Sequence, residues 1–336
     1  MSRAYRRAGV DLEASVRAVE MIGEIAAKAT RPEVAAGIGG FAGLFRIGEG
    51  RLLAAAADGV GTKLEIARQA GWLDTVGIDL VAMCANDVVC TGAEPLFFLD
   101  YLACGRLVPE EVAAVVGGVA EGCREAGCAL LGGETAEHPG LMEEGRFDLA
   151  GFCVGLVGED DLLGPHRVRE GDLLVGLPSS GLHSNGFSLV RRALEDEGVG
   201  LEAAPPELGR PLVDELLEPT RIYVRPVLEA AREGLVQAAA HVTGGGLLGN
   251  LPRILPPGLG ARLHPGGWQI PPIFRFIQRL ADADEQDIWQ TLNMGLGLLL
   301  AVRPEAAETC ASMLRASGVE ASVVGRVDAG EGVTIG

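Results

Sequence analysis

Residues 52–70 of the chain read LLAAAADGVGTKLEIARQA, and this stretch decides how the first half folds. The apolar run at 52–57 has the length and composition of a buried strand, and residues 64–70 have helical character. The motif DGVGTK at 58–63 is therefore predicted at a strand-to-helix turn. Strands that feed directly into helices are typical of a mixed α/β (α+β) fold.

Helices and strands continue to alternate on both sides of this stretch. The pattern predicts helices at 13–28, 79–91 and 109–126, strands at 96–104, 128–131 and 147–157, and a flexible glycine-rich loop at 37–45. After a turn-rich segment at 158–171 it predicts strands at 172–177, 235–242, 298–302 and 321–327 and helices at 187–196, 222–232 and 304–316. With 336 residues we expect two domains, 1–165 and 166–336.

Composition excludes several classes of function. The formal net charge of −18 opposes binding to nucleic acid or to an anionic membrane surface. The start MSRAYRRAGV has no apolar export signal, and no stretch is long and apolar enough for a membrane span. The seven cysteines contain no C-x-x-C pair, so we expect reduced, mostly buried thiols in a cytoplasmic protein.

The DGVGTK turn offers the groups that bind phosphate and magnesium. Gly59 and Gly61 expose backbone N–H groups, Thr62 adds a hydroxyl, Lys63 adds an ammonium, and Asp58 adds a carboxylate for a cation. The sequence lacks the G-x-x-x-x-G-K-[ST] spacing of a P-loop. An ordinary tight turn with a solvated Asp and Lys is the alternative interpretation.

Two further carboxylates are candidate metal ligands. Asp87 follows Asn86 inside an apolar helix, where a buried carboxylate needs a cation or another partner. Glu134 stands in GGETAE, directly after the short strand predicted at 128–131. An outward-facing Asp87 and a plain turn at Glu134 are the alternatives.

Two polar, glycine-rich loops in the second half are candidate substrate-binding loops. Their residues with hydroxyl, amide or exposed backbone groups are Ser180, Gly181, Ser184 and Asn185 in SSGLHSNG and Thr243, Gly244 and Gly245 in TGGG. His183 and His241 lie in or beside these loops and have the residue type suited to proton transfer near neutral pH. Plain turns and structural histidines remain the alternatives.

Taken together, the long ordered motifs GIGGFAGLF, DGVGTK, GIDLVAMCANDVV, GGETAEHPG, SSGLHSNGFSLVR, PTRIYV and HVTGGG resemble the phosphoribosylformylglycinamidine cyclo-ligase (aminoimidazole ribonucleotide synthetase) family over nearly the whole chain. The resemblance implies a two-domain ATP-binding fold whose N-terminal strands form a barrel in a homodimer. It also implies ATP-dependent closure of the imidazole ring of 5-aminoimidazole ribonucleotide from formylglycinamidine ribonucleotide, in de novo purine biosynthesis, through phosphorylation of the formyl oxygen.

The resemblance assigns residue roles by position. Asp58, Asp87 and Glu134 match metal or nucleotide ligands for Mg²⁺ and ATP, and Lys63 falls where a phosphate or substrate contact is expected. The mobile loop that closes over nucleotide corresponds to Gly37, Gly39, Gly40 and Phe41. His241 replaces an Asp that kinase-like relatives carry before T-G-x-G, which speaks against a metal ligand at that position.

Two rival functions remain at this stage. One is another small-molecule phosphoryl transferase of the same superfamily, which the continuous match through HSNGFSLVR and PTRIYV disfavours. The other is a nucleotide-binding regulator without turnover, which the joint presence of Asp58, Lys63, Asp87 and Glu134 disfavours.

Overall fold

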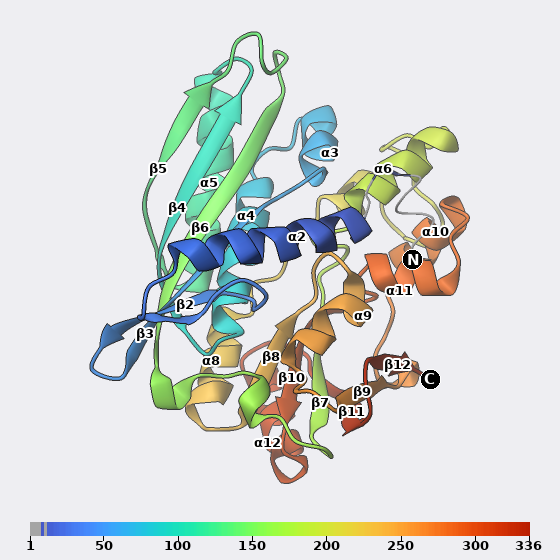
Figure 1. The fold of residues 1–336 in the computed structure, drawn as a ribbon. Helices are drawn as coiled ribbons and strands as arrows, with labels where there is room; N and C mark the ends of the chain where they lie inside the picture. The colour runs from blue at the N-terminus through green and yellow to red at the C-terminus, as the bar shows by residue number, and fades with distance from the viewer. Residues whose placement is uncertain (1–7, 10–11) are drawn as a thin grey trace.

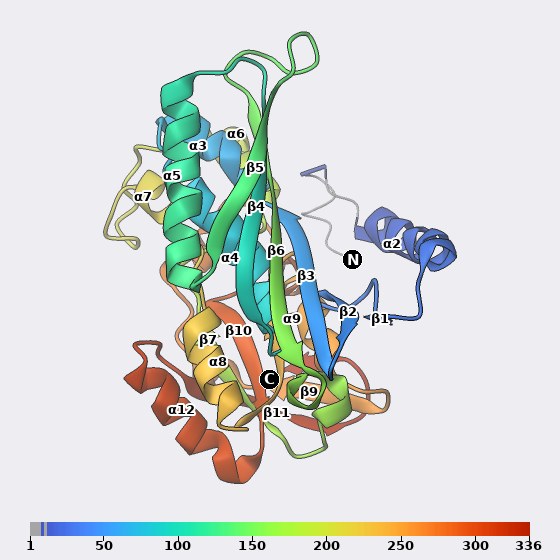
Figure 2. The ribbon, with the colours of Figure 1, turned by 90° about the vertical axis from the view of Figure 1, so that its left-hand side faces the viewer.

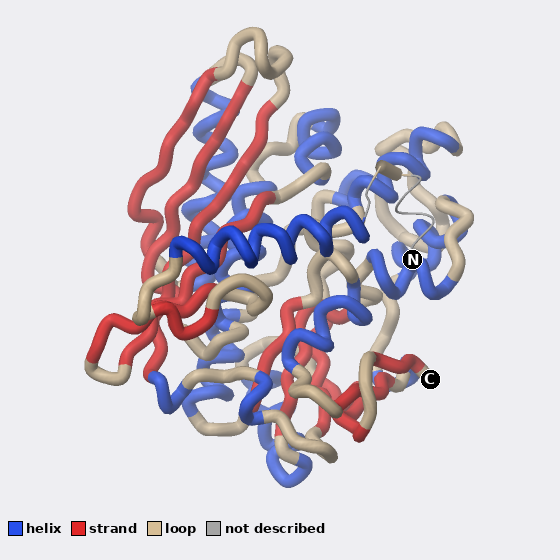
Figure 3. Tube along the Cα trace, viewed as in Figure 1, coloured by secondary structure: helices blue, strands red, loops and turns tan. Residues whose placement is uncertain are grey.

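The structure is a computed structural model, and it describes residues 8–9 and 12–336. These residues form two six-stranded sheets, each built from one half of the chain. Figures 1 and 3 show the first sheet standing above the second, with helices packed beside both. No helix in the described part of the chain is both long and apolar enough to cross a membrane.

The first sheet has the strand order β1-β2-β3-β6-β4-β5. Its strands are β1 (Val34–Ala36), β2 (Gly43–Gly48), β3 (Arg51–Gly59), β4 (Glu94–Cys104), β5 (Ala129–Glu137) and β6 (Phe147–Gly158). Figure 2 shows helices α4 (Val76–Val89) and α5 (Pro109–Ala126) on one face, while α2 (Leu12–Ala26) stands apart on the other side. Helix α3 (Lys63–Ala70) follows β3 directly. One face of this sheet is therefore packed, and the other is open.

The second sheet has the order β12-β9-β11-β7-β10-β8. Its strands are β7 (Leu173–Pro178), β8 (Val236–His241), β9 (Leu259–Leu263), β10 (Leu296–Val302), β11 (Ser322–Ala329) and β12 (Val333–Ile335). Its helices are α6 (Phe187–Asp196), α7 (Leu212–Leu216), α8 (Val224–Arg232), α9 (Gly246–Asn250), α10 (Pro272–Leu280), α11 (Glu285–Thr291) and α12 (Ala307–Ala316). Every residue of β10 is buried, so its unbroken apolar run forms the centre of this half.

The strongly periodic elements are predicted well. Helices α5 and α6 match the predicted helices at 109–126 and 187–196 residue for residue. The loop predicted at 37–45 is wrong from Gly43 onward, because β2 begins there and pairs with β3. The short strand predicted at 128–131 is wrong at its end, because β5 continues through GGETAE and pairs with β4 as far as Glu137. Backbone pairing overrides the turn character of glycine at both places.

Short 3-10 segments join the elements in the described part of the chain: η1 (Ala27–Ala29), η2 (Glu159–Asp161), η3 (Pro165–Arg167), η4 (Leu251–Ile254), η5 (Pro265–Gly267) and η6 (Pro304–Ala306). The segments η2 and η3 lie between the two sheets, within the turn-rich stretch at 158–171. The composition of that stretch, with Gly164-Pro165 at its centre, suits a connection better than a regular element.

Helices α4 and α5 approach each other through glycine. A Cβ placed on Gly118 would lie 2.0 Å from the Asp74 carbonyl oxygen, and a Cβ placed on Gly77 would lie 2.3 Å from the Val115 carbonyl oxygen. Gly117, the neighbour of Gly118 in α5, has no heavy atom within 4 Å of such a Cβ. The two adjacent glycines of α5 therefore have different physical roles.

We predict opposite effects for the same substitution at these two positions. Gly118→Ala should lower the free energy of unfolding by about 1–3 kcal/mol, because the added methyl group overpacks a contact made of backbone. Gly117→Ala should raise it by up to about 1 kcal/mol, because alanine is the better helix former at an exposed position. Urea unfolding followed by circular dichroism measures both, and equal effects at the two positions would refute the close approach.

Candidate active site

The DGVGTK turn lies where the sequence predicts it, between β3 and α3. Asp58 is half-buried near the end of β3, and its Oδ1 accepts the Gly59 backbone N–H at 2.7 Å. Gly61 adopts a left-handed conformation, with φ of 71°, that glycine reaches without strain. Thr62 and Gly61 are exposed, so this end of the turn is open to a ligand.

Asp58 and Asp87 form a half-buried carboxylate pair at the heart of the site. Burial raises the pKa of Asp58, and the negative charge of Asp87 raises it further, against the Gly59 N–H, which lowers it. His241, at the end of β8, lies beside Asp87 with its Nδ1 2.9 Å from Asp87 Oδ1. A half-buried carboxylate with a second carboxylate nearby is a suitable environment for a divalent cation.

The glycine-rich loop before β2 is tied to the second half by Arg253. The Arg253 guanidinium lies over the Phe41 ring, 3.9 Å from its centroid, and donates to the Gly40 carbonyl oxygen. It also donates to Asn250 Oδ1 at 3.3 Å. Arg253 lowers the pKa of Asp58 as well, which places its charge near the carboxylate pair. Arg253 therefore links Gly40 and Phe41, in the same loop as the exposed Gly37 and Gly39, to the surroundings of that pair.

The two glycine-rich loops of the second half meet each other. A Cβ on Gly244 would lie 3.6 Å from Asn185 Oδ1. Asn250 Nδ2 donates to the carbonyl oxygens of Thr243, Gly244 and Gly246 at 3.3, 3.2 and 2.9 Å, which fixes the TGGG turn, and Thr243 Oγ1 donates to Asn250 Oδ1. Gly244 is exposed and Gly245 half-buried, so their backbone remains available to a ligand.

The hydroxyl groups of SSGLHSNG are used inside the protein. Ser180 Oγ donates to the Pro219 carbonyl oxygen at 2.5 Å, and Ser184 Oγ shares a hydrogen bond with Thr220 Oγ1 at 3.1 Å. Gly181 is buried, while Asn185 is half-buried. The hydroxyl groups of Ser180 and Ser184 are therefore bonded within the protein, while Asn185 lies next to Gly244. Substrate contact by Ser180, Gly181, Ser184 and Asn185 stays a prediction.

The two candidate catalytic histidines are both enclosed. His241 is 0% exposed, and both ring nitrogens have neighbours, Asp87 at Nδ1 and Asn86 Nδ2 at 3.5 Å from Nε2. His183 has φ of 62°, and its Nε2 accepts the Ser180 backbone N–H at 3.2 Å. Burial holds the pKa of His183 well below its usual range, so its ring is neutral. These contacts hold both rings in place, and proton transfer by either histidine remains a prediction.

Lys63 does not reach a phosphate site. Its side chain is 0% exposed, and its Nζ lies 2.8 Å from Asp79 Oδ2 and donates to the Glu218 carbonyl oxygen at 2.8 Å. Asp79 Oδ1 also accepts the Thr220 N–H at 2.7 Å. The prediction of Lys63 as a catalytic residue is therefore wrong. The sequence places it correctly at the start of α3, but the first helical turn directs it inward.

We predict that Lys63→Met acts on stability. Removal of one partner of a buried ion pair leaves an uncompensated charge on Asp79, and the expected loss is about 3–5 kcal/mol of unfolding free energy. Lys28→Met is the matched control, since Lys28 is exposed and is the other lysine of the chain. Thermal and urea unfolding measure both. A Lys63→Met protein that unfolds like the wild type yet no longer turns over ATP would restore the phosphate role.

Glu134 lies apart from the aspartate pair. Across the sheet, Glu134 pairs with Tyr101, Tyr101 pairs with Ala150, and Ala150 pairs with Gly59. Because side chains alternate between the two faces of a strand, Asp58, the residue before Gly59, points to the face opposite Glu134. Three strand spacings of roughly 4.8 Å also separate β5 from β3. The described residues contain no group of three His, Cys, Asp or Glu that could hold a metal ion. The prediction that Glu134 completes a magnesium site with Asp58 and Asp87 is therefore wrong within one chain.

Sequence reasoning missed Arg253 and Asp79. Arg253 lies in the stretch NLPRILPPG, and nothing in its spacing marks it as a partner of Phe41. Asp79 could have been found, because a carboxylate in the apolar helix GIDLVAMCANDVV requires a cation, and Lys63 is one of only two lysines.

The two halves of the chain match the two domains of AIR synthase related proteins. Residues 39–157 match the family "AIR synthase related protein, N-terminal domain", and residues 169–336 match "AIR synthase related protein, C-terminal domain". Among solved structures, tt0281 from Thermus thermophilus aligns with a TM-score of 0.67 at 25% identity, covering 94% of this chain and 95% of that chain. AaThiL complexed with AMPPCP and TMP aligns with a TM-score of 0.67 at 18% identity, covering 94% and 92%. At 18% identity, the similarity to AaThiL shows that the two proteins share a fold.

The particular family follows from closer relatives. The chain is 51% identical to phosphoribosylformylglycinamidine cyclo-ligase of Shouchella clausii over 100% of this chain and 99% of the relative. It is 53% identical to the protein of the same name from Myxococcus xanthus over 99% and 98%. The chain therefore belongs to the phosphoribosylformylglycinamidine cyclo-ligase family, a family of ATP-dependent ring-closing ligases of purine biosynthesis.

Proposed function

We propose that this chain converts formylglycinamidine ribonucleotide into 5-aminoimidazole ribonucleotide with ATP as the phosphoryl donor. The observation that carries the proposal is the pair Asp58 and Asp87, near the charge of Arg253, which contacts both Phe41 and the Asn250 that holds the TGGG turn. This arrangement combines carboxylates for a cation with exposed glycine backbone for phosphate oxygens.

The reaction requires activation of a poor electrophile. The formyl oxygen of the substrate attacks the γ-phosphorus of ATP, and the bond from that phosphorus to ADP breaks. The neighbouring nitrogen then attacks the formyl carbon, the carbon–oxygen bond breaks, and inorganic phosphate leaves as the nitrogen loses a proton. Catalysis of such a transfer consists mainly of positioning and charge stabilisation, so buried positioning histidines are compatible with it.

Asp58 and Asp87 are the residues that would hold Mg²⁺. Burial and then the charge of Asp87 raise the pKa of Asp58, and a divalent cation would offset both; phosphate oxygens and water would complete its ligands, as is usual for magnesium. Bound there, Mg²⁺ would neutralise charge on the ATP phosphates. His241 donates its Nδ1–H to Asp87 and keeps that carboxylate in one orientation.

The Phe41 loop has the properties of a nucleotide cover. Gly37, Gly39 and Gly40 are exposed and impose little side-chain bulk, while Phe41 is anchored by the Arg253 cation–π contact. Arg253 also reaches Asn250, which fixes the TGGG turn. One arginine thereby links two loops that would face the nucleotide.

We predict that purified protein with Mg²⁺ forms ADP and aminoimidazole product in equal amounts, and only when formylglycinamidine ribonucleotide is present. Asp87→Asn should lower kcat by at least about 100-fold, because it removes a charge that supports the developing phosphate. The exposed Glu94→Gln variant is the matched control. Coupled ADP release and a diazo-coupling assay measure the two products.

The same experiment separates the rival functions. ATP binding without substrate-dependent ADP release would refute the cyclo-ligase reaction and favour a regulator. ADP release with a different phosphoryl acceptor would favour another transferase of the same fold. Calorimetric titration with ADP and Mg²⁺ tests the metal assignment separately, since Asp87→Asn should weaken only the magnesium-dependent part of the affinity.

We further propose a homodimer that joins the open faces of two first sheets, in the cytoplasm. Large side chains remain exposed on β4, β5 and β6: Tyr101 at 40%, Leu131 at 65% and Phe152 at 41%. Figure 2 shows that α4 and α5 pack on the opposite side of these strands. An exposed row of this kind is typical of a protein interface.

The expected mass in solution is twice 34.9 kDa. We predict that Leu131→Glu shifts the protein toward monomer, because a charge would be buried at the centre of the contact. Trp72→Glu, at an exposed apolar position that follows α3, should leave the mass unchanged. Sedimentation equilibrium distinguishes the outcomes, and a wild-type monomer at micromolar concentration would contradict the proposed dimer.

A further inference from the structure

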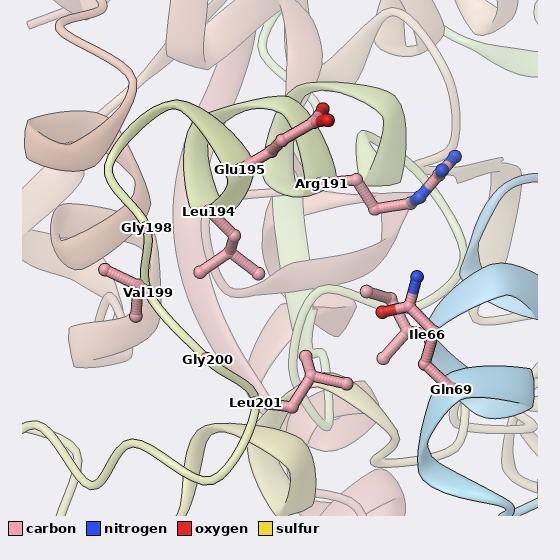
Figure 4. A pocket seen from close by; sticks show the side chains of 9 residues that line it. All are labelled: Ile66, Gln69, Arg191, Leu194, Glu195, Gly198, Val199, Gly200 and Leu201. Atoms are coloured by element: carbon pink, nitrogen blue, oxygen red, sulfur yellow. The ribbon is translucent and has the colours of Figure 1, made fainter.

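Two cavities lie side by side between α3 and α6, and they share one residue. The first, of about 380 Å³, has in its lining Thr62, Glu65, Arg68, Arg146, Asp148 and Arg191. The second, of about 410 Å³ and shown in Figure 4, also has Arg191 in its lining. The first cavity therefore lies between the exposed end of the DGVGTK turn, at Gly61 and Thr62, and helix α6 of the second half.

Arg191 is the charged residue that the two cavities share. It is half-buried on α6, and among the described residues it makes no hydrogen bond or ion pair. Its neighbour Arg192 is exposed and pairs with Asp196 at 2.8 Å. In a chain with a net charge of −18, where acids greatly outnumber bases, an unpaired guanidinium in a cavity marks a place for an anion.

The other charged side chains that line the first cavity make their interactions with residues other than Arg191. Glu65 is bonded to Arg68 at 2.7 Å and also to Arg146, and the hydrogen bond from Arg68 lowers the pKa of Glu65 to about 2. Glu65 therefore stays ionised and engages both of these arginines. Asp148 Oδ1 accepts the Leu149 backbone N–H at 2.9 Å.

Two hydroxyl groups, those of Ser188 and Thr62, meet where α6 contacts the DGVGTK turn. Ser188 lies three residues before Arg191 on α6, so both side chains project from one face of the helix. Ser188 Oγ lies 3.2 Å from Thr62 Oγ1, which joins α6 to the DGVGTK turn. A guanidinium with two adjacent hydroxyls presents the donors that a phosphate monoester requires.

The second cavity is a less suitable place for an anion than the first. Figure 4 shows its apolar side chains Leu194, Val199 and Leu201 together with the carboxylate of Glu195. No residue in the lining of this cavity carries a hydroxyl group, whereas Thr62 lines the first cavity. The anion therefore belongs on the Thr62 side of Arg191.

We propose that this cavity holds the sugar 5-phosphate of the substrate, bound by Arg191, Ser188 and Thr62. The inference rests on the proposed function and adds the site of the substrate's phosphate. Thr62 lies four residues after Asp58, a span of at most roughly 14 Å. A ribotide anchored at Arg191 can therefore extend its reacting end toward the aspartate pair.

The test compares Arg191→Gln with Arg192→Gln. Arg191→Gln should raise KM for formylglycinamidine ribonucleotide by about 10- to 100-fold, because charged hydrogen bonds to phosphate are lost, and should leave KM for ATP and the melting temperature unchanged. Arg192→Gln should behave as wild type in all three. A KM for the ribotide within twofold of wild type in Arg191→Gln overturns the proposal.

A binding experiment separates this site from the reaction. Ribose 5-phosphate should bind the wild-type protein by calorimetry, bind Arg191→Gln at least about 10-fold more weakly, and bind better than unphosphorylated ribose. Arg191-dependent binding without cyclo-ligase turnover would support the phosphate site and refute the proposed function. Turnover together with Arg191-independent binding would support the function and overturn the site.

Discussion

The buried ion pair between Lys63 and Asp79 is the interaction on which the arrangement of both halves depends. Lys63 begins the helix after the DGVGTK turn, and its Nζ also donates to the Glu218 carbonyl oxygen of the second half. Asp79 accepts the Thr220 backbone N–H and hydroxyl at 2.7 and 2.6 Å. Asn86, two turns further along α4, binds the same segment through Tyr223 N–H and Arg221 carbonyl oxygen. Polar groups of one helix thus fix the second half against the first.

These contacts of Lys63, Asp79 and Asn86 with the second half determine which polar side chains are available to bind a ligand. Because Lys63, Asp79 and Asn86 are occupied, the half-buried Asp58 and Asp87 are the carboxylates left facing the loops that carry exposed glycine. His241 and Arg253 then complete the site from the second half, one through Asp87 and the other through Phe41. The candidate site therefore forms at the contact between the halves, and a shift of either half would separate the carboxylates from the TGGG turn.

Much of the fold can be predicted from periodicity, and parts of the site can be predicted from residue chemistry. Long amphipathic helices such as α5 and α6 are predicted at their bounds, because burial of one face imposes a regular spacing. Asp58 and Asp87 are recognisable because carboxylates beside apolar or glycine-rich segments need a partner. The role predicted for Lys63 is wrong because sequence does not state whether the side chain that follows a glycine turn points to solvent or to the core. The role predicted for Glu134 is wrong because alternation within β5 turns it to the open face.

The sequence by itself determined the class of fold, the family resemblance and the two aspartates, because these depend on local spacing and on residue types with few alternative uses. The tertiary structure decided which positively charged side chains form ion pairs inside the protein and which remain available to a ligand. Lys63 is neutralised inside the protein, whereas Arg191, in a cavity between α3 and α6, has no ion-pair partner among the residues that the structure describes. The physical reason is that pairing depends on distances between segments remote in sequence, and those distances exist only after the two halves pack together.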